Sequence, residues 1–273
     1  MNILVTLDEN YIPPLKVMLW SLFFNNPGCD FKVYLLHSSI PENSLRSLRR
    51  FVENNGQKLF PIQIDNNYFE NAPVVMHYTK EMYYRLLAYK FLPQDMNKIL
   101  YLDPDILIIN SIRELYNMDI SDNLFAAAFH KRVPIKEINK LRLKAYEMEE
   151  YFNSGVLLMN LELQRKEIDE GEIFKYVEKN KARLVLPDQD ILNALFAKRI
   201  KALDEFKYNF DTRYYKYARL LNSKAINMEY IIKNTVILHF CGKKKPWKKN
   251  YSGKFHSLYQ HYIALSQRQR LKH

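Results

Sequence analysis

The chain has 273 residues, 48% of them hydrophobic, and a formal net charge of +11. This length and composition predict a globular protein with a substantial core. They argue against a membrane-spanning helix, because no run of about eighteen apolar residues occurs. Residues 230–273 contain Lys and Arg but no Asp or Glu. Such a block is typical of a protein that meets a phosphate-rich partner, or of a solvated basic tail.

The cysteine content and the start of the chain favour a cytoplasmic protein. Cys29 and Cys241 are too few for a disulfide framework. The sequence is apolar directly from Met1, without the basic segment that begins a signal peptide. Both features fit a reducing compartment.

The first hundred residues alternate β-prone runs with helical patterns. Strands are predicted at 3–6, 31–36, 59–64 and 98–102, and helices at 13–22, 41–52 and about 80–91. Strands that alternate with helices imply βαβ units, and therefore a mostly parallel sheet covered on both faces. The fold class is expected to be α/β.

The second half of the chain is less regular. Further strands are predicted at 125–128, 156–160 and 236–239. An amphipathic stretch covers 163–179, Asp188 could cap a helix that continues to about Lys198, and a last helix covers 255–265. We expect a catalytic domain at 1–250 and a basic, helical extension at 251–273.

Two carboxylates two residues apart, Asp103 and Asp105, directly follow the predicted strand 98–102. In open α/β sheets ligands bind outside the carboxyl ends of the strands, so the position is meaningful. Carboxylates next to a diphosphate make an oxygen-rich site suited to Mg²⁺ or Mn²⁺. Taken alone, the Asp-Pro-Asp segment could equally be a turn.

A second polar cluster follows the predicted strand 236–239. Neutral imidazole at His239 could complete a metal site, Gly242 permits close backbone approach to a phosphate, and Lys245 could pair with it. An isolated histidine beside a lysine run would more often be structural.

Six motifs in order along the chain resemble glycosyltransferase family 8, which includes bacterial lipopolysaccharide galactosyl- and glucosyltransferases and glycogenin. They are residues 6–11, 84–86, 98–105, 152–161, 187–193 and 239–247. The resemblance spans nearly the whole chain. It implies the GT-A fold, a Rossmann-like sheet with a smaller mixed sheet. It also implies transfer of galactose or glucose from a UDP-sugar, with Mn²⁺ and with retention of anomeric configuration.

The resemblance also implies roles for individual residues. Asp103, Asp105 and His239 would bind the metal, and Gly242 and Lys245 would hold the diphosphate. Asp8 and Asn10 would contact uracil or ribose, with Tyr11 stacking nearby. The donor sugar would be surrounded by Arg85, Asn153, Ser154, Gly155, Asp188 and Gln189.

Each role has a structural alternative. Asp8 and Asn10 could only shape a turn, Asp188 could only cap a helix, and residues 153–155 could only be a turn before a buried strand. Arg85 could be an ordinary surface cation. For the whole protein, the alternatives are a sugar-nucleotide nucleotidyltransferase and a non-catalytic nucleotide-sugar binder. A nucleic-acid partner is not expected, because it would leave the acidic site unexplained.

The acceptor is expected to be a glycan or a lipid-linked saccharide. His130, Lys131 and Arg132 stand where the family commonly has an aspartate, which predicts a different acceptor that carries an anionic group. The basic residues after 247, interleaved with Phe255, Tyr259 and Tyr262, could seat the protein on the anionic inner face of the cytoplasmic membrane, or only pack against the domain.

Overall fold

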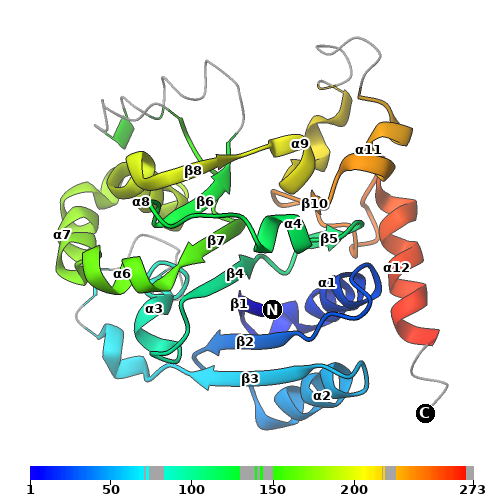
Figure 1. The fold of residues 1–273 in the computed structure, drawn as a ribbon, viewed down its shortest axis with the longest axis horizontal. Helices are drawn as coiled ribbons and strands as arrows, with labels where there is room; N and C mark the ends of the chain where they lie inside the picture. The colour runs from blue at the N-terminus through cyan, green and yellow to red at the C-terminus, as the bar shows by residue number, and fades with distance from the viewer. Residues whose placement is uncertain are drawn as a thin grey trace.

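Two sheets form the framework of the computed structural model, which describes residues 1–70, 72–73, 83–129, 139, 142–143, 150–216, 218 and 226–268 (Figure 1). The larger sheet has seven strands in the order β3-β2-β1-β4-β7-β6-β8, and the smaller has three in the order β5-β10-β9. The strands are β1 (Asn2–Thr6), β2 (Lys32–His37), β3 (Lys58–Gln63), β4 (Lys98–Leu102), β5 (Ile106–Ile108), β6 (Phe125–Ala128), β7 (Val156–Asn160), β8 (Ile200–Leu203), β9 (Phe210–Asp211) and β10 (Ile237–His239).

The larger sheet is mostly parallel, as predicted. Strands β3, β2, β1 and β4 all pair in parallel, β7 runs antiparallel to β4 and β6, and β8 is parallel to β6. The chain builds β1, β2 and β3 outward in one direction and then returns to place β4 on the other side of β1. The carboxyl ends of β1 and β4 therefore flank a topological switch point, where α/β sheets bind ligands.

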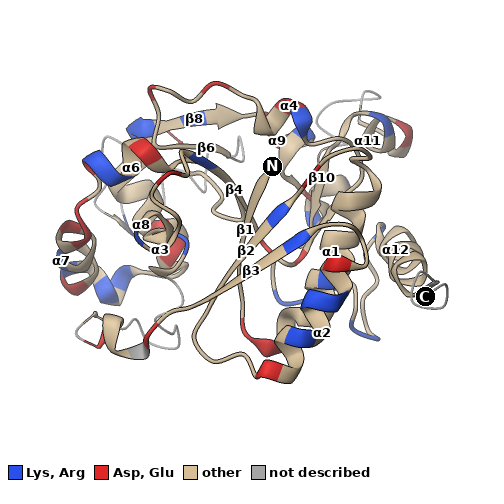
Figure 2. Ribbon diagram, turned by 60° about the horizontal axis from the view of Figure 1, so that its bottom comes forward, with Lys and Arg blue, Asp and Glu red and all other residues tan. Residues whose placement is uncertain are grey.

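The central strands are apolar on both faces because helices cover both. In β1, Ile3 and Val5 pack on one side of the sheet and Leu4 on the other, as the two-residue period of a strand requires. Leu100 and Tyr101 divide between the two faces of β4 in the same way. Charged residues lie mainly on the helices and loops (Figure 2).

The helices are unequal in length. They are α1 (Ile12–Phe24), α2 (Glu42–Glu53), α3 (Ala88–Phe91), α4 (Arg113–Tyr116), α6 (Leu161–Glu167), α7 (Glu170–Asn180), α8 (Pro187–Phe196), α9 (Glu205–Tyr208), α11 (Met228–Asn234) and α12 (His256–Arg268). Core residues of α1, α2 and α12 cover one face of the larger sheet, and those of α3, α6, α7 and α8 cover the other. No helix within the described ranges combines the length and the apolar character needed to cross a bilayer.

The helix predicted at 80–91 is wrong over most of its described length, and the amphipathic stretch 163–179 contains two helices. Of the helix predicted at 80–91, residues 80–82 lie outside the described residues, 83–87 form turns, and only Ala88–Phe91 is α-helical. The turns let Tyr83 and Tyr84 pack into the core. The stretch 163–179 is two helices, α6 and α7. They separate at Asp169, whose carboxylate accepts the Gly171 N–H and so starts a new helix.

The helix after residue 186 starts differently from the prediction. Asp188 does not cap it. Leu186 is the N-cap residue, Pro187 occupies the first turn, and Asp188 lies inside the helix. Proline suits this position because the first amide has no partner in a helix. The α-helix ends at Phe196, and a short 3₁₀ turn continues to Arg199. The Asp188 carboxylate is thereby free to face the site described below.

Helix α12 belongs to the hydrophobic core and does not offer its aromatic side chains to a surface. Tyr259 is 0% exposed and packs against Phe240 with ring centroids 5.2 Å apart. Tyr262 meets Trp20 of α1 in an edge contact at 5.9 Å. Tyr259 and Tyr262 therefore pack against the domain, which is one of the two alternatives that the sequence left open. Binding of anionic liposomes through the exposed Lys248, Lys249 and Lys254 stays a prediction.

Replacing Tyr259 tests whether α12 is part of the core. Tyr259→Ala should lower the free energy of unfolding by about 3–5 kcal/mol, because it leaves a large cavity. Tyr259→Phe should change it by no more than about 1 kcal/mol, because the buried hydroxyl has no hydrogen-bond partner among the described residues. Urea unfolding followed by circular dichroism measures both. A small effect of Tyr259→Ala would show that α12 is only loosely attached.

Candidate metal and donor site

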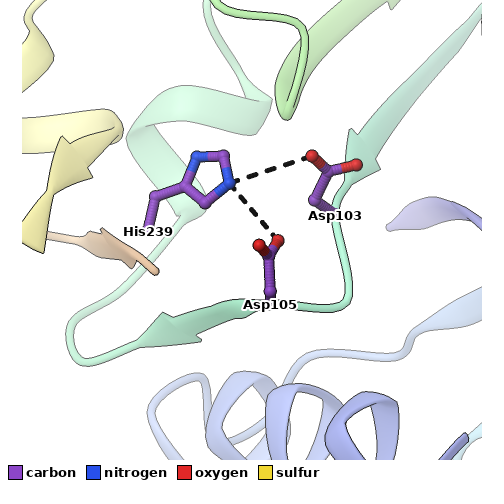
Figure 3. Close-up of side chains that lie close together, drawn as sticks. All are labelled: Asp103, Asp105 and His239. Carbon is purple, nitrogen blue, oxygen red and sulfur yellow. Dashed lines mark ion pairs between the residues drawn. The ribbon is translucent and has the colours of Figure 1, made fainter. Parts of the chain in front are cut away.

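Three potential metal ligands converge at the switch point. Asp103 and Asp105 lie in the loop between β4 and β5, and β5 pairs antiparallel with β10, so that His239 lies opposite Ile106. One ligand atom from each residue lies within 4.8 Å of the others. His239 Nε2 is 3.3 Å from Asp105 Oδ1 and 3.8 Å from Asp103 Oδ2, and the three side chains point toward one another (Figure 3).

The donor set and its surroundings fit a divalent cation. Two carboxylates and an imidazole suit Mn²⁺, and Mg²⁺ less fully because it prefers oxygen alone. Gly155 keeps the space at this centre open. A Cβ atom on Gly155 would lie 2.4 Å from His239 Cε1 and 2.6 Å from Asp103 Oδ2. The glycine of the Asn-Ser-Gly segment is therefore required by the close approach of strand β7 to these ligands.

Buried charge dominates the site. Burial raises the pKa of Asp103, an effect that Arg85 opposes and the like charge of Asp105 reinforces. Burial acts in the same direction on Asp105, but His239 and Lys245 outweigh it and hold the pKa of Asp105 below its usual value. The Lys245 ammonium contacts Asp105 directly and donates to the Phe240 carbonyl at 3.0 Å. The neighbourhood thus attracts positive charge, which a metal ion or a proton can supply.

His239 shows the same attraction. Burial alone would lower its pKa, but Cys241 and Asp105 raise it above the usual value. A cation bound between the carboxylates would displace that proton, because histidine binds metals in its neutral form.

Arg85 connects the carboxylates of Asp103 and Asp188. Its Nη1 atom is 3.1 Å from Asp103 Oδ1 and 3.1 Å from Asp188 Oδ2. The guanidinium lies over the Tyr101 ring at 4.5 Å and also donates to the Ser154 carbonyl at 3.2 Å. Arg85 is therefore not an ordinary surface cation.

The first turn of α8 contacts the Asn-Ser-Gly segment. Ser154 Oγ donates to Asp188 at 2.8 Å, and Gln189 Oε1 accepts from Asn153 Nδ2 at 3.1 Å. Asn193, one helical turn later, bonds both the N–H and the C=O of Phe152, at 2.6 and 2.7 Å. This helix therefore fixes the loop that starts β7.

Asp190 stabilises the segment that precedes α8. It is fully buried and accepts from Arg142, from Tyr151 and from the backbone N–H groups of Val185 and Leu186. The third residue of the Asp-Gln-Asp motif therefore holds the segment before α8, while Asp188 faces Arg85.

One cavity of about 470 Å³ joins these groups. Among the predicted site residues, its lining includes Arg85, Asp103, Asp105, Asn153, Ser154, Asp188, Gln189, His239 and Gly242. A cavity of this size suits a small polar ligand held by a few convergent groups. Residues 130–132 lie outside the described residues.

The predicted nucleoside residues are placed differently. Asp8 and Asn10 are exposed and do not line this cavity. The Asp8 carboxylate accepts the Asn10 N–H at 2.8 Å, which is the turn-forming contact that the structural alternative predicted. Tyr11 meets Trp247 edge to face at 6.0 Å. These three residues follow β1 and so lie on the β1 side of the switch point.

Sequence reasoning missed two features of the site. Asn209, which directly follows α9, hydrogen-bonds the His239 ring. Arg213 lines the cavity and is held by the buried Asp211 through its Nε and Nη2 atoms, with Nη2 2.6 Å from Asp211 Oδ2. Neither residue lies in a motif or in a predicted element, and the sequence around them offers only the β-prone Phe210, directly after Asn209, as a signal.

Comparison with known proteins identifies the class. The model of the family "Glycosyl transferase family 8" matches residues 2–251. General stress protein A of Bacillus subtilis is 28% identical over 97% of this chain and 94% of its own length. A lipopolysaccharide 1,2-glucosyltransferase of Escherichia coli is 24% identical over 91% of this chain and 73% of its own length.

A solved structure agrees with these relatives. The crystal structure of the galactosyltransferase LgtC with donor and acceptor sugar analogs matches 97% of this chain and 96% of its own, with a TM-score of 0.81 and 25% identity. The chain belongs to glycosyltransferase family 8, and its two sheets confirm the expected GT-A fold.

The space that Gly155 leaves is testable without any sugar substrate. Gly155→Ala should weaken Mn²⁺ binding about tenfold or more, because its Cβ would displace His239 or Asp103. Isothermal titration with MnCl₂ measures the affinity. The control is Gly171→Ala in the exposed first turn of α7, where the nearest atom to the added Cβ is Asp169 Oδ1 at 3.3 Å. Equal Mn²⁺ affinity in both variants would refute the steric argument.

Proposed function

We propose that this protein transfers a hexose, galactose or glucose, from a UDP-sugar to a glycan or lipid-linked saccharide with retention of anomeric configuration. The observation that carries the proposal is the convergence of Asp103, Asp105 and His239, with Lys245 against Asp105, in a cavity that Arg85 and Asp188 also line. Family membership favours this function over a nucleotidyltransferase or a silent binder.

The metal side of the cavity would hold the donor diphosphate. Asp103, Asp105 and His239 would bind Mn²⁺, or Mg²⁺ in its place, and the cation would neutralise charge that develops on the departing diphosphate. Lys245 would move from Asp105 to a phosphate oxygen. Gly242, at φ +85°, has no side chain, so its backbone would be able to approach a phosphate closely. Asp8, Asn10 and Tyr11 would contact the nucleoside on the β1 side.

The opposite side of the cavity would hold the sugar. Arg85, Ser154 and Asp188 form a hydrogen-bonded group that can bind sugar hydroxyls. Asn153 and Gly155, on either side of Ser154 in the chain, would complete the surroundings of the sugar. Asp188 and Gln189 would lie near the anomeric carbon. The Asp188 carboxylate is paired with Arg85 and accepts a hydrogen bond from Ser154. These contacts suit a carboxylate that binds the sugar better than one that acts as a nucleophile. We therefore propose attack by the acceptor hydroxyl on the same face from which UDP departs.

The donor and the metal are tested together by a hydrolysis panel. Purified protein with Mn²⁺ is given a series of UDP-sugars, and UDP release is measured for wild type and Asp105→Ala. One UDP-hexose should be preferred, and the variant should lose about 100-fold or more in rate, because it loses a ligand that also anchors Lys245. If the two proteins hydrolyse every donor alike, the metal assignment fails.

The stereochemical route is tested at Asp188. Asp188→Ala should reduce turnover about 100-fold, because Arg85 and Ser154 lose their shared partner and the sugar is misplaced. Added azide should not restore product formation. Mass spectrometry and proton NMR would detect a glycosyl azide. An azide of inverted configuration would instead indicate a covalent intermediate on the enzyme and overturn same-face attack.

A further inference from the structure

A chain of side-chain amides links the candidate metal ligand His239 to Gln189, one of the residues proposed to surround the sugar. Asn209 is only 2% exposed, and its two amide atoms face different partners. Its Oδ1 atom is 2.8 Å from His239 Nδ1, and its Nδ2 atom donates to Asn153 Oδ1 at 2.8 Å. Asn153 Nδ2 in turn donates to Gln189 Oε1 at 3.1 Å. Three amides thus connect β10 with the first turn of α8.

Backbone N–H groups decide the direction of this chain. The Gly155 N–H donates to Asn153 Oδ1 at 3.0 Å, so the Asn153 atom that meets Asn209 is an oxygen. Asn209 must therefore turn its NH₂ group toward Asn153 and its oxygen toward His239. At the other end the Ser154 N–H approaches Gln189 Oε1 at 3.4 Å, which fixes that atom as an oxygen too. A backbone N–H can only donate, so these orientations follow from the packing.

The direction has a consequence at each end. His239 must carry a hydrogen on Nδ1 to donate to Asn209, so Nε2, which faces Asp103 and Asp105, is the nitrogen whose lone pair would bind a metal that displaces its proton. Gln189 has its oxygen occupied by two N–H donors. The atom that it can offer to the cavity is Nε2, which has two hydrogens to donate and of which one meets Tyr151.

We propose that Asn209 is a positioning residue that presents His239 Nε2 to the metal. By donating to Asn153 it also holds the Asn153 amide, which together with the Ser154 N–H keeps Gln189 turned so that its Nε2 donates to the bound sugar. The first part of the proposal, the metal half, concerns His239 and rests on geometry alone. The second part, the sugar half, concerns Gln189 and rests on the proposed function. Partners of metal-bound histidines commonly change metal affinity 10–100-fold when they are removed.

Two substitutions separate the two halves. Asn209→Leu removes both hydrogen bonds and should weaken Mn²⁺ binding about 10–100-fold. Asn209→Asp keeps an oxygen for His239 but places a carboxylate against Asn153 Oδ1. It should therefore bind Mn²⁺ within about threefold of wild type, while kcat at saturating Mn²⁺ falls about tenfold or more. Titration with Mn²⁺ alone and donor hydrolysis give the two readings.

The matched control is Asn26→Leu. Asn26 is also 2% exposed and lies just after the C-terminal end of α1. It accepts a hydrogen bond from the Ile112 N–H and donates one to the Leu22 carbonyl. It should lower the melting temperature and leave Mn²⁺ affinity unchanged.

Wild-type Mn²⁺ affinity in Asn209→Leu, or an equal loss in Asn26→Leu, overturns the role of Asn209. If Asn209→Asp weakens Mn²⁺ binding as much as Asn209→Leu is expected to, the proposed hydrogen-bond direction is overturned. This measurement on Asn209→Asp also tests the proposal if Asn209→Leu does not fold. Unchanged kcat in Asn209→Asp overturns the sugar half. If no UDP-sugar is hydrolysed by wild type, the proposed function fails, whereas the Mn²⁺ titrations still judge the metal half.

Discussion

The site depends on the burial of two carboxylates, Asp103 and Asp105, at the end of β4. A buried charge is unfavourable unless it is paired and hydrogen-bonded. Arg85 pairs with Asp103, Lys245 pairs with Asp105, and His239 lies between them. These cations come from separate parts of the sequence, so the need to neutralise the carboxylates ties those parts to a single place.

Sheet topology makes that pairing possible. Because β4 returns to the side of β1 opposite β2, the loop after β4 lies at the switch point. The antiparallel strand β7 then brings Gly155 against this loop, where the Asp103 N–H donates to the Gly155 carbonyl at 2.8 Å. The small sheet adds His239 through the pairing of β5 with β10. The site therefore forms where the loop after β4, the start of β7 and the small sheet meet.

Local patterns predicted the regular parts of the fold well. Strands β1, β2 and β4 are apolar runs that end at turn residues, and burial on both faces leaves little alternative. Predictions failed where a tertiary contact outweighed a local preference. The segment around Arg85 has a helical pattern, yet turns form there, and they place the guanidinium between Asp103 and Asp188. Asp188 resembles a helix cap, yet Arg85 and Ser154 take its carboxylate.

The sequence by itself determined the family, the α/β class and the residue types that meet at the centre, because six motifs occur in order and each follows or precedes a recognisable element. Only the tertiary structure decided which atoms of these residues face the site. Which nitrogen of His239 faces the carboxylates depends on Asn209, which lies 30 positions away. Which atom of Gln189 can donate into the cavity depends on the backbone at Ser154, 35 positions away. Hydrogen-bond direction is a property of packed neighbours, and packing over such separations is not written in any local pattern.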